Sequence, residues 1–375
     1  MTDPVVRALA YLSRVVEPPC PDLAALVARV GPVEAADRVK RRAIDAQLRH
    51  LTEARHEIDC AARDLTILAR LGGRLVTAAD AEWPFLAFTA FGPVDTKQRP
   101  KAHPPLALWV TGPARLDEVA ERAAAIVGTR AATAYGEHVA AELAAGLAER
   151  DVAVVSGGAY GIDGAAHRAA LAADGFTVAV LASGVDVSYP AGHGALFHRI
   201  SEQGLIVTEY APGLRPQRHR FLTRNRLVAA LSGATVVVEA GARSGAANTA
   251  AWARVLGRGV CAVPGPVTSS ASVGCHLLMR AGATVVTRAD EITELVGHVG
   301  ELAVDAERPS SLLDGLADNE LRVYDAFPAR GARTADEIAV ASGLPATHVL
   351  GPLSMLEIAG LVVCRDGRWK LAPVG

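Results

Sequence analysis

The sequence predicts an α/β fold: a doubly wound, largely parallel sheet with a small helical domain before it and a winged helix after it. Two observations support this prediction. Between residues 124 and 297, seven short apolar runs alternate with helix-length segments, which is typical of parallel strands joined by helical crossovers. Residues 312–375 then show three helical segments and a terminal hairpin, the order of a winged helix-turn-helix.

Length and composition are those of a globular protein with two or three domains: 375 residues, 50% hydrophobic and 21% charged. No apolar run approaches the roughly 18 residues that a bilayer requires, and the N-terminus lacks the order of a secretory signal, so we expect a cytoplasmic protein. Five cysteines are scattered without a C-x-x-C pair. This argues against a disulfide framework or a zinc site, and we expect no metal and no cofactor.

Residues 1–68 are predicted to form the helical domain. An amphipathic segment covers 5–16, Pro21 opens a second helix, and Gly31-Pro32 separates it from a helical stretch over 33–70. We interpret the cations at 38–42 as a solvated helix face, with a nucleic-acid contact as the alternative. Residues 71–114 have an irregular texture with an extra strand or two.

The predicted core spans residues 69–299. Its strands are expected at 124–127, 152–155, 178–181, 205–208, 235–238, 260–263 and 284–286. In such sheets, ligands bind outside the carboxyl ends of the strands, where helix N-termini also lie. Loops rich in Gly and hydroxyl groups follow four of the strands: Gly128-Thr129-Arg130, Ser156-Gly157-Gly158, Ser183-Gly184 and Ser244-Gly245. One such loop only makes a turn, but four together indicate an anion site.

Two nucleotide-binding motifs are absent. A dinucleotide fold needs G-x-G-x-x-G after its first strand, and here only Gly128 stands there. The P-loop pattern G-x-x-x-x-G-K-[ST] does not occur either. Asp163 and His167 share a helix face, and a helix-capping Asp with a packed His is favoured over a metal or acid–base pair. The sequence therefore offers no assignable catalytic group.

The densest cluster of positive charge is the tract 215–226, with five arginines, one histidine, Phe221 and no acid, leading into a helix expected to begin near Asn225. Arginines at this density bind a strand of phosphates, and Phe221 is available to stack on a base. The alternative is an exposed basic turn balanced by acids elsewhere.

The C-terminal unit follows a Pro-containing acidic linker at 300–311. Asp366-Gly367 predicts a tight hairpin turn. The second helix of the helix-turn-helix, at 346–353, has no Lys or Arg, and only the wing is basic, with Arg365, Arg368 and Lys370. A DNA reader and a docking module both stay open for residues 312–375.

Short motifs in the core resemble the DNA-processing protein A (DprA, or Smf) family. They are 126–130 with Thr133 and Tyr135-Gly136; 156–163 with Ala166-His167; Gly184 with Tyr189-Pro190; Glu209-Tyr210; Phe221 with 224–226; Glu239-Ala240 with Ser244-Gly245 and Thr249-Ala250; and 263–265. Two positions depart from the family pattern: Leu222-Thr223 follows Phe221, and Ala191-Gly192-His193 stands where a basic residue and an Asn are frequent.

The resemblance implies a SAM-like helical domain, a Rossmann-like core and a winged helix. It implies a non-enzymatic protein that binds single-stranded DNA, protects it during natural transformation and loads the recombinase RecA, acting as a homodimer through the core. The DNA-binding residues that it implies are Gly128, Thr129, Arg130, Ser156, Gly157, Gly158, Arg218, Arg220, Phe221, Arg224, Asn225, Arg226, Ser244 and Gly245. The glycine and Thr129 amides, with Ser156, would contact phosphates, and Phe221 would lie near a base.

Two other functions stay open. The core also resembles nucleotide-binding proteins and nucleoside-monophosphate phosphoribohydrolases, but residues 239–245 lack the P-G-G-x-G-T-x-x-E signature of those enzymes. A regulator that reads duplex DNA is the third possibility, and the absence of cations in the second helix of the C-terminal unit argues against it.

Overall fold

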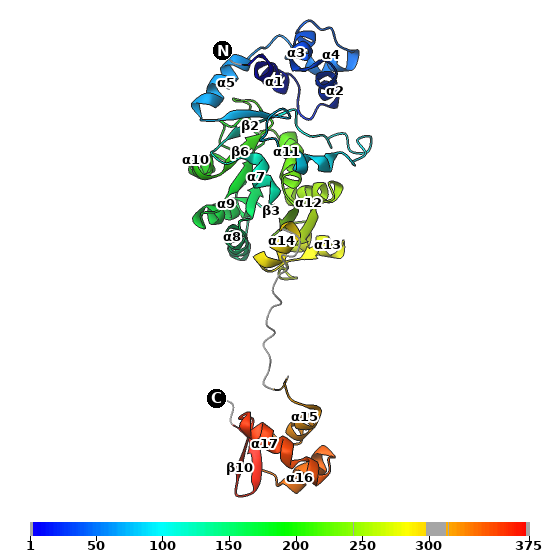
Figure 1. Cartoon of the computed structure of the whole chain (residues 1–375), viewed down its shortest axis with the longest axis vertical. Coiled ribbons are helices and arrows are strands. Elements are labelled where there is room, and N and C mark those ends of the chain that lie inside the picture. The colour runs from blue at the N-terminus through cyan, green and yellow to red at the C-terminus, as the bar shows by residue number, and fades with distance from the viewer. Residues whose placement is uncertain (1–2, 243, 298–312, 314, 373–375) are drawn as a thin grey trace. The chain divides into compact units, whose positions relative to one another are not determined.

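The structure of the chain is a computed structural model that describes residues 3–242, 244–297, 313 and 315–372. It divides into two compact units, Met1–Ala303 and Val304–Gly375. The first holds a sheet of nine strands with helices around it, and the second is a winged helix (Figure 1). The predicted fold class is confirmed. The linker expected at 300–311 lies outside the described residues, and the finer domain boundaries stay predictions.

The sheet has the strand order β1-β2-β6-β5-β4-β3-β7-β8-β9. From β6 to β9 all neighbours are parallel, whereas β1 and β2 are antiparallel additions at one edge. The strands are β1 Arg74–Thr77, β2 Ala107–Thr111, β3 Ala123–Val127, β4 Ala153–Ser156, β5 Thr177–Val180, β6 Leu205–Thr208, β7 Ala234–Val237, β8 Gly259–Ala262 and β9 Thr284–Val285. The order reverses between β3 and β7, which makes this the topological switch point.

Alternate residues of the central strand β3 enter different cores. Ala125 and Val127 pack with residues of α11 and α12, whereas Ala124 and Ile126 pack with α8 and α9. Figure 1 shows these two helix pairs on opposite sides of the sheet. The helices of the core are α6 Phe85–Phe88, α7 Leu116–Glu121, α8 Ala134–Ala148, α9 Ile162–Ala172, α10 Gly194–Gln203, α11 Arg218–Ala230, α12 Gly245–Val255, α13 Val273–Arg280 and α14 Ala289–Val296. Because both faces of β3 are covered, the strand is apolar throughout.

The N-terminal helices pack on β1 and β2, where Leu75 and Trp109 join their core. They are α1 Pro4–Val15, α2 Pro21–Val30, α3 Pro32–Lys40, α4 Ala46–Thr52 and α5 Ala61–Arg70. The helical stretch expected over 33–70 is thus three helices. One break follows Arg42, which has a left-handed φ of 59°, and Asp45 then caps α4 by accepting a hydrogen bond from the Leu48 amide at 2.8 Å.

The second unit has its own core, formed around Val323, Ile338, Leu353 and Val362. Its helices are α15 Asp318–Asp325, α16 Ala335–Ser342 and α17 Leu350–Ile358, and its hairpin is β10 Val362–Arg365 with β11 Arg368–Leu371. The turn residues Asp366 and Gly367 have φ of 51° and 73°, as the predicted tight hairpin requires. Among the described residues no single helix is long and apolar enough to span a bilayer; one pair bent by 101°, Ala335–Ser342 with Ala346–Ile358, passes by length and composition alone.

Candidate nucleic-acid interface

A pocket of about 720 Å³ lies at the carboxyl ends of β3 and β4, beside the switch point. Loops after β3 and β4 form one side of it, and α11 and the start of α12 form the other. Ten residues of the predicted DNA-binding set line it: Gly128, Thr129, Arg130, Gly157, Arg218, Phe221, Arg224, Asn225, Ser244 and Gly245. The pocket lies where open α/β sheets bind ligands.

The loop after β3 is fixed by Glu239, which follows β7. The Thr129 amide donates to the Glu239 carbonyl at 2.7 Å, and the Thr133 hydroxyl and amide donate to its carboxylate at 2.6 and 2.9 Å. Thr133 in turn caps α8. The Glu239 side chain is therefore a structural anchor, and the loop that it holds leaves Arg130 exposed at the mouth of the pocket.

The loop after β4 is fixed by Asp163 in the first turn of α9. Its carboxylate accepts hydrogen bonds from the Gly157 and Ala159 amides at 3.1 and 3.4 Å. Two of the amides that were predicted to contact phosphate, those of Thr129 and Gly157, make internal hydrogen bonds in the structure. The contacts to a ligand are therefore expected to come mainly from side chains, above all from the arginines.

His167 lies behind Asp163, as the sequence predicted. Its Nδ1 is 2.6 Å from the Thr177 hydroxyl, deep in the protein. Burial lowers the pKa of His167 to about 3, with smaller effects from His193 and nearby arginines. A neutral histidine packed in this way is a core residue and does not face the pocket.

The helix expected to begin near Asn225 begins at Arg218, so that part of the prediction is wrong. The reason is physical: residues 223–230 are all buried, and the arginines among them hide the apolar periodicity that marks a helix in sequence. Helical spacing then sorts the tract onto two faces. Arg218, Phe221 and Arg224 line the pocket, whereas Arg220 and Arg226 do not.

Arg224 is the deepest cation of the pocket, with 6% of its surface exposed. Its guanidinium donates to the Val180 carbonyl, and among the described residues its Nε has no hydrogen-bond partner. Burial and the neighbouring Arg130 lower the pKa of Arg224 to about 10, against attraction from Asp163. The side chain is still charged at neutral pH, so the pocket presents a buried cation to an anion.

Phe221 and Arg130 form one wall of the pocket. The Arg130 guanidinium lies 5.2 Å from the centre of the Phe221 ring. The centre of the Tyr189 ring lies 5.5 Å from the centre of the same Phe221 ring. Asn225 ties α11 to α12, because its amide donates to the Gly245 carbonyl at 3.3 Å and to Asn248 at 3.1 Å. Sequence inspection gave no role to Tyr189 or Asn248; their position next to predicted residues is visible only in the fold.

Four residues of the predicted set lie elsewhere. Arg220 is bound to Glu17 of the N-terminal helices at 2.6 Å, and Arg226 to Glu209 at 2.6 Å. The Ser156 hydroxyl is buried and donates to the Ile126 carbonyl at 2.6 Å. Gly158 has a φ of 68° and is covered by Phe197, 2.6 Å from where its Cβ would stand. All four hold the fold around the pocket.

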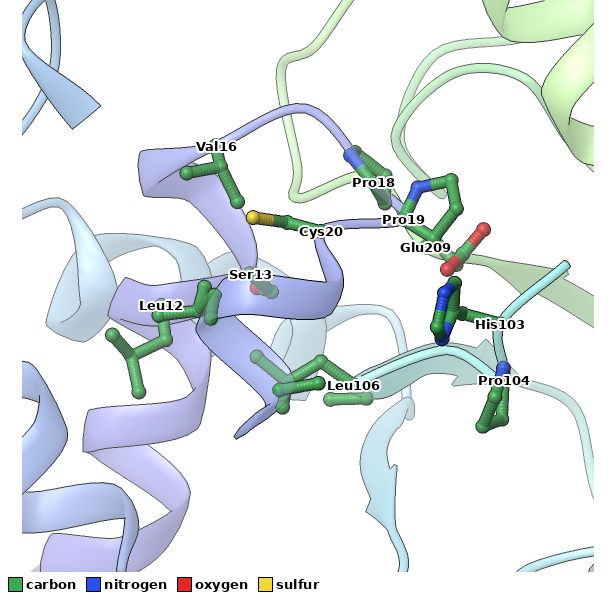
Figure 2. A pocket seen from close by; sticks show the side chains of 13 residues that line it. Leu12, Ser13, Val16, Pro18, Pro19, Cys20, His103, Pro104, Leu106 and Glu209 are labelled. Atoms are coloured by element: carbon green, nitrogen blue, oxygen red, sulfur yellow. The ribbon is translucent and has the colours of Figure 1, made fainter. Parts of the chain in front are cut away.

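The buried pair Arg226–Glu209 adjoins a small cavity of about 30 Å³ between the N-terminal helices and the lead into β2 (Figure 2). Glu209, His103, Pro19 and Cys20 are among its lining residues. This volume holds about one water molecule, so the cavity is part of the packing and not a ligand site.

The cations at 38–42 are mostly paired, which supports the interpretation as a solvated helix face. Arg38 contacts Glu34 at 2.7 Å, Lys40 contacts Asp59 at 2.7 Å, and Arg41 pairs with Asp37. Surface pairs of this kind mainly serve solubility.

Comparison with known proteins assigns the chain to a family. A family model described as DNA recombination-mediator protein A matches residues 74–297, which hold the whole sheet and the pocket. The chain belongs to the DprA family. A second model, the DprA winged helix domain, matches residues 307–368. The resemblance found in the sequence is thus confirmed.

Individual relatives cover most of the chain. A putative DNA processing protein DprA of Mycobacterium tuberculosis is 68% identical over 375 residues, with all of this chain and 96% of its own length covered. The X-ray structure of DprA from Streptococcus pneumoniae superposes with a TM-score of 0.63 at 27% identity, over 79% of this chain and 99% of its own. DprA from Helicobacter pylori, studied for its single-stranded DNA binding mode, superposes with a TM-score of 0.50 at 27% identity, over 58% of this chain and 92% of its own.

Proposed function

We propose that the pocket binds single-stranded DNA. The observation that carries the proposal is the set of three arginines, Arg130, Arg218 and Arg224, around one aromatic ring, Phe221, at the switch point of the sheet. Guanidinium groups bind phosphates, and an accessible ring stacks on an unpaired base. In a duplex, the faces of the bases are stacked on one another, so a single strand fits this chemistry better.

The lining of the pocket favours binding over catalysis. Among the described residues, Asp163 is the one carboxylate that lines it, and its Oδ2 accepts hydrogen bonds from the Gly157 and Ala159 amides. A phosphoribohydrolase-like or other nucleotide-processing enzyme needs a free acid or base at the reacting atoms. Arg243, within the 239–245 segment compared with those enzymes, lies outside the described residues. We therefore favour a non-enzymatic role. We place this role in the cytoplasm as part of the proposal.

The wider role includes protection of incoming DNA, loading of RecA in natural transformation, and a homodimer through the core. Family membership supports all three, and the basic pocket supports the first directly, because bound DNA is withheld from nucleases. RecA-driven strand exchange on DNA coated with single-strand-binding protein should accelerate when this protein is added. Sedimentation should give twice the monomer mass. An unchanged exchange rate would contradict RecA loading, and a monomer mass would contradict the dimer.

The test of DNA binding is fluorescence anisotropy with a labelled single-stranded oligonucleotide and its duplex. The wild type should prefer the single strand, and the variant Arg130→Ala with Arg224→Ala should lose most of that affinity. The matched control is Arg29→Ala with Arg49→Ala, which removes the same charge from exposed positions on the N-terminal helices. Equal losses in both double variants would show that net charge, and not the pocket, governs binding.

A further inference from the structure

Two exposed tyrosines continue the aromatic wall: Tyr189 lines the pocket next to Phe221, and Tyr160 lies outside its lining. Tyr189 is 45% exposed and lies 5.5 Å from Phe221, and Tyr160 is 48% exposed in the loop after β4. A single exposed aromatic ring is common on protein surfaces, but neighbouring exposed rings that adjoin a pocket are typical of a binding surface. Tyr189 begins a short segment, residues 189–193, and the last two residues of that segment contact Tyr160.

The segment 189–193 gives Tyr160 a rigid base. The Tyr160 ring packs edge-on against His193 at 4.8 Å, and His193 is 7% exposed, with Nδ1 3.0 Å from the Gly158 carbonyl. Gly192 leaves the space that the tyrosine takes, because a Cβ there would stand 2.6 Å from the Tyr160 hydroxyl oxygen. Because the Tyr160 side chain is already held by these contacts, it loses little conformational entropy when its exposed part binds a ligand.

A cation, Arg168, lies close to His193, the residue against which Tyr160 packs. A Cβ built at Gly164 would be 2.7 Å from the His193 ring and 3.1 Å from an Arg168 Nη atom, so Arg168 and His193 converge on one point. Arg168 is exposed and forms no ion pair with a carboxylate of the described residues. The row therefore begins at Arg130 and Phe221 and ends at Arg168, with two tyrosines between.

We propose that a single strand of nucleic acid leaves the pocket along this row, with bases stacked on Tyr189 and Tyr160 and a phosphate at Arg168. The inference rests on the proposed function of the pocket and extends its site by aromatic contacts. Stacking on a ring requires the face of an unpaired base and is tolerant of its identity. The row thus lengthens the DNA-binding site and increases its preference for single strands over duplexes, without adding sequence specificity.

The experiment measures anisotropy with a labelled single-stranded oligonucleotide and with copies that carry abasic sites along the strand. Tyr160→Ala should weaken binding of the intact strand about 5- to 10-fold, which is the low end of the range for loss of one stacked base. The same substitution should change the affinity little for a strand that lacks the base stacked on Tyr160. Tyr160→Phe should bind within about twofold of wild type. Phe176→Ala is the matched control, since Phe176 is 53% exposed and precedes the amino end of β5, whereas the pocket lies at the carboxyl ends of the strands.

The outcomes separate the two proposals. If the wild type binds the single strand and Tyr160→Ala and Tyr189→Ala both bind as tightly, the pocket stands and the row is refuted. An equal loss of affinity for the intact and the abasic strand also refutes stacking, because the substitution then acts through the fold. Should the alanine variant fail to fold, Tyr160→Leu, which keeps the bulk of the side chain, is used for the same comparison. If the wild type binds no single strand, the proposed function fails, and this inference fails with it.

Discussion

Arg226→Met is expected to destabilise the core while leaving the charge of the pocket intact. Arg226 and Glu209 have side-chain exposures of 0% and 2% and are joined by a hydrogen bond of 2.6 Å. The Arg226 Nε also donates to the Lys101 carbonyl at 3.1 Å. Removal of the guanidinium leaves the Glu209 carboxylate buried without a counterion, which costs about 3–5 kcal/mol of folding free energy.

This free energy corresponds to a fall in melting temperature of about 6–20 °C for a domain of this size. The loss should depend on pH. Burial raises the pKa of Glu209, and Arg226 opposes this effect. Without Arg226 the folded-state pKa rises further, so the variant loses most stability at high pH, where the carboxyl must be ionised, and regains part of it as the pH falls and the carboxyl takes up a proton.

The assay is thermal unfolding followed by circular dichroism at pH 6 and pH 8. Arg218→Met, on the exposed first residue of the same helix, is the control and should shift the free energy of unfolding by less than about 0.5 kcal/mol. Arg226→Met combined with Glu209→Met should recover most of the loss, because both charges are then gone. An Arg226→Met variant that melts like the wild type at both pH values would refute the account of this pair.

Three further predictions concern the pocket and its supports. Phe221→Ala should weaken single-strand binding by about 1–3 kcal/mol in anisotropy, through loss of a stacked base, and an unchanged Kd would exclude Phe221 from the interface. For Glu17, burial raises the pKa but hydrogen bonds from two arginines, foremost Arg220, outweigh it and lower the pKa to about 2. This contribution, on the order of 1 kcal/mol after solvent screening, is present above pH 4.5 and is lost between pH 4.5 and 2, so acid unfolding of Glu17→Gln should be less steep there than that of the wild type. Gly128→Ala should weaken DNA binding at least as much as Phe221→Ala, because the added methyl overlaps Ile162 and displaces the loop that carries Arg130; wild-type affinity in that variant would show that the loop adapts.

The strands of the core could be predicted from the sequence because each parallel strand is buried on both faces. Residues 205–208 were expected as a strand and form β6, and the other predicted core strands fall within about one residue of those observed. A continuous apolar run bounded by glycine allows few other structures. The same physics placed three of the four predicted Gly-rich loops, those at 128–130, 156–158 and 244–245, at the carboxyl ends of the strands, where the pocket lies, whereas Ser183 and Gly184 are not among its lining residues.

The sorting of the arginines could not be predicted. Arg220 and Glu17 are 203 residues apart, and nothing in the local sequence distinguishes Arg220 from Arg218 or Arg224. Which arginine is neutralised depends on how the N-terminal helices pack against α11. For the same reason, the sequence could not show that two of the amides expected to hold phosphate, those of Thr129 and Gly157, are bonded to Glu239 and Asp163, whose positions depend on the fold.

The central claim is that the arginines of the pocket contact phosphates of a single strand. The most direct measurement is the salt dependence of single-strand affinity for the wild type and for Arg130→Ala with Arg224→Ala. Each lost phosphate contact should reduce the slope of log K against log salt by roughly 0.7, so the double variant should lose about 1.4. A slope that the double variant leaves unchanged would contradict the claim, whatever the affinities.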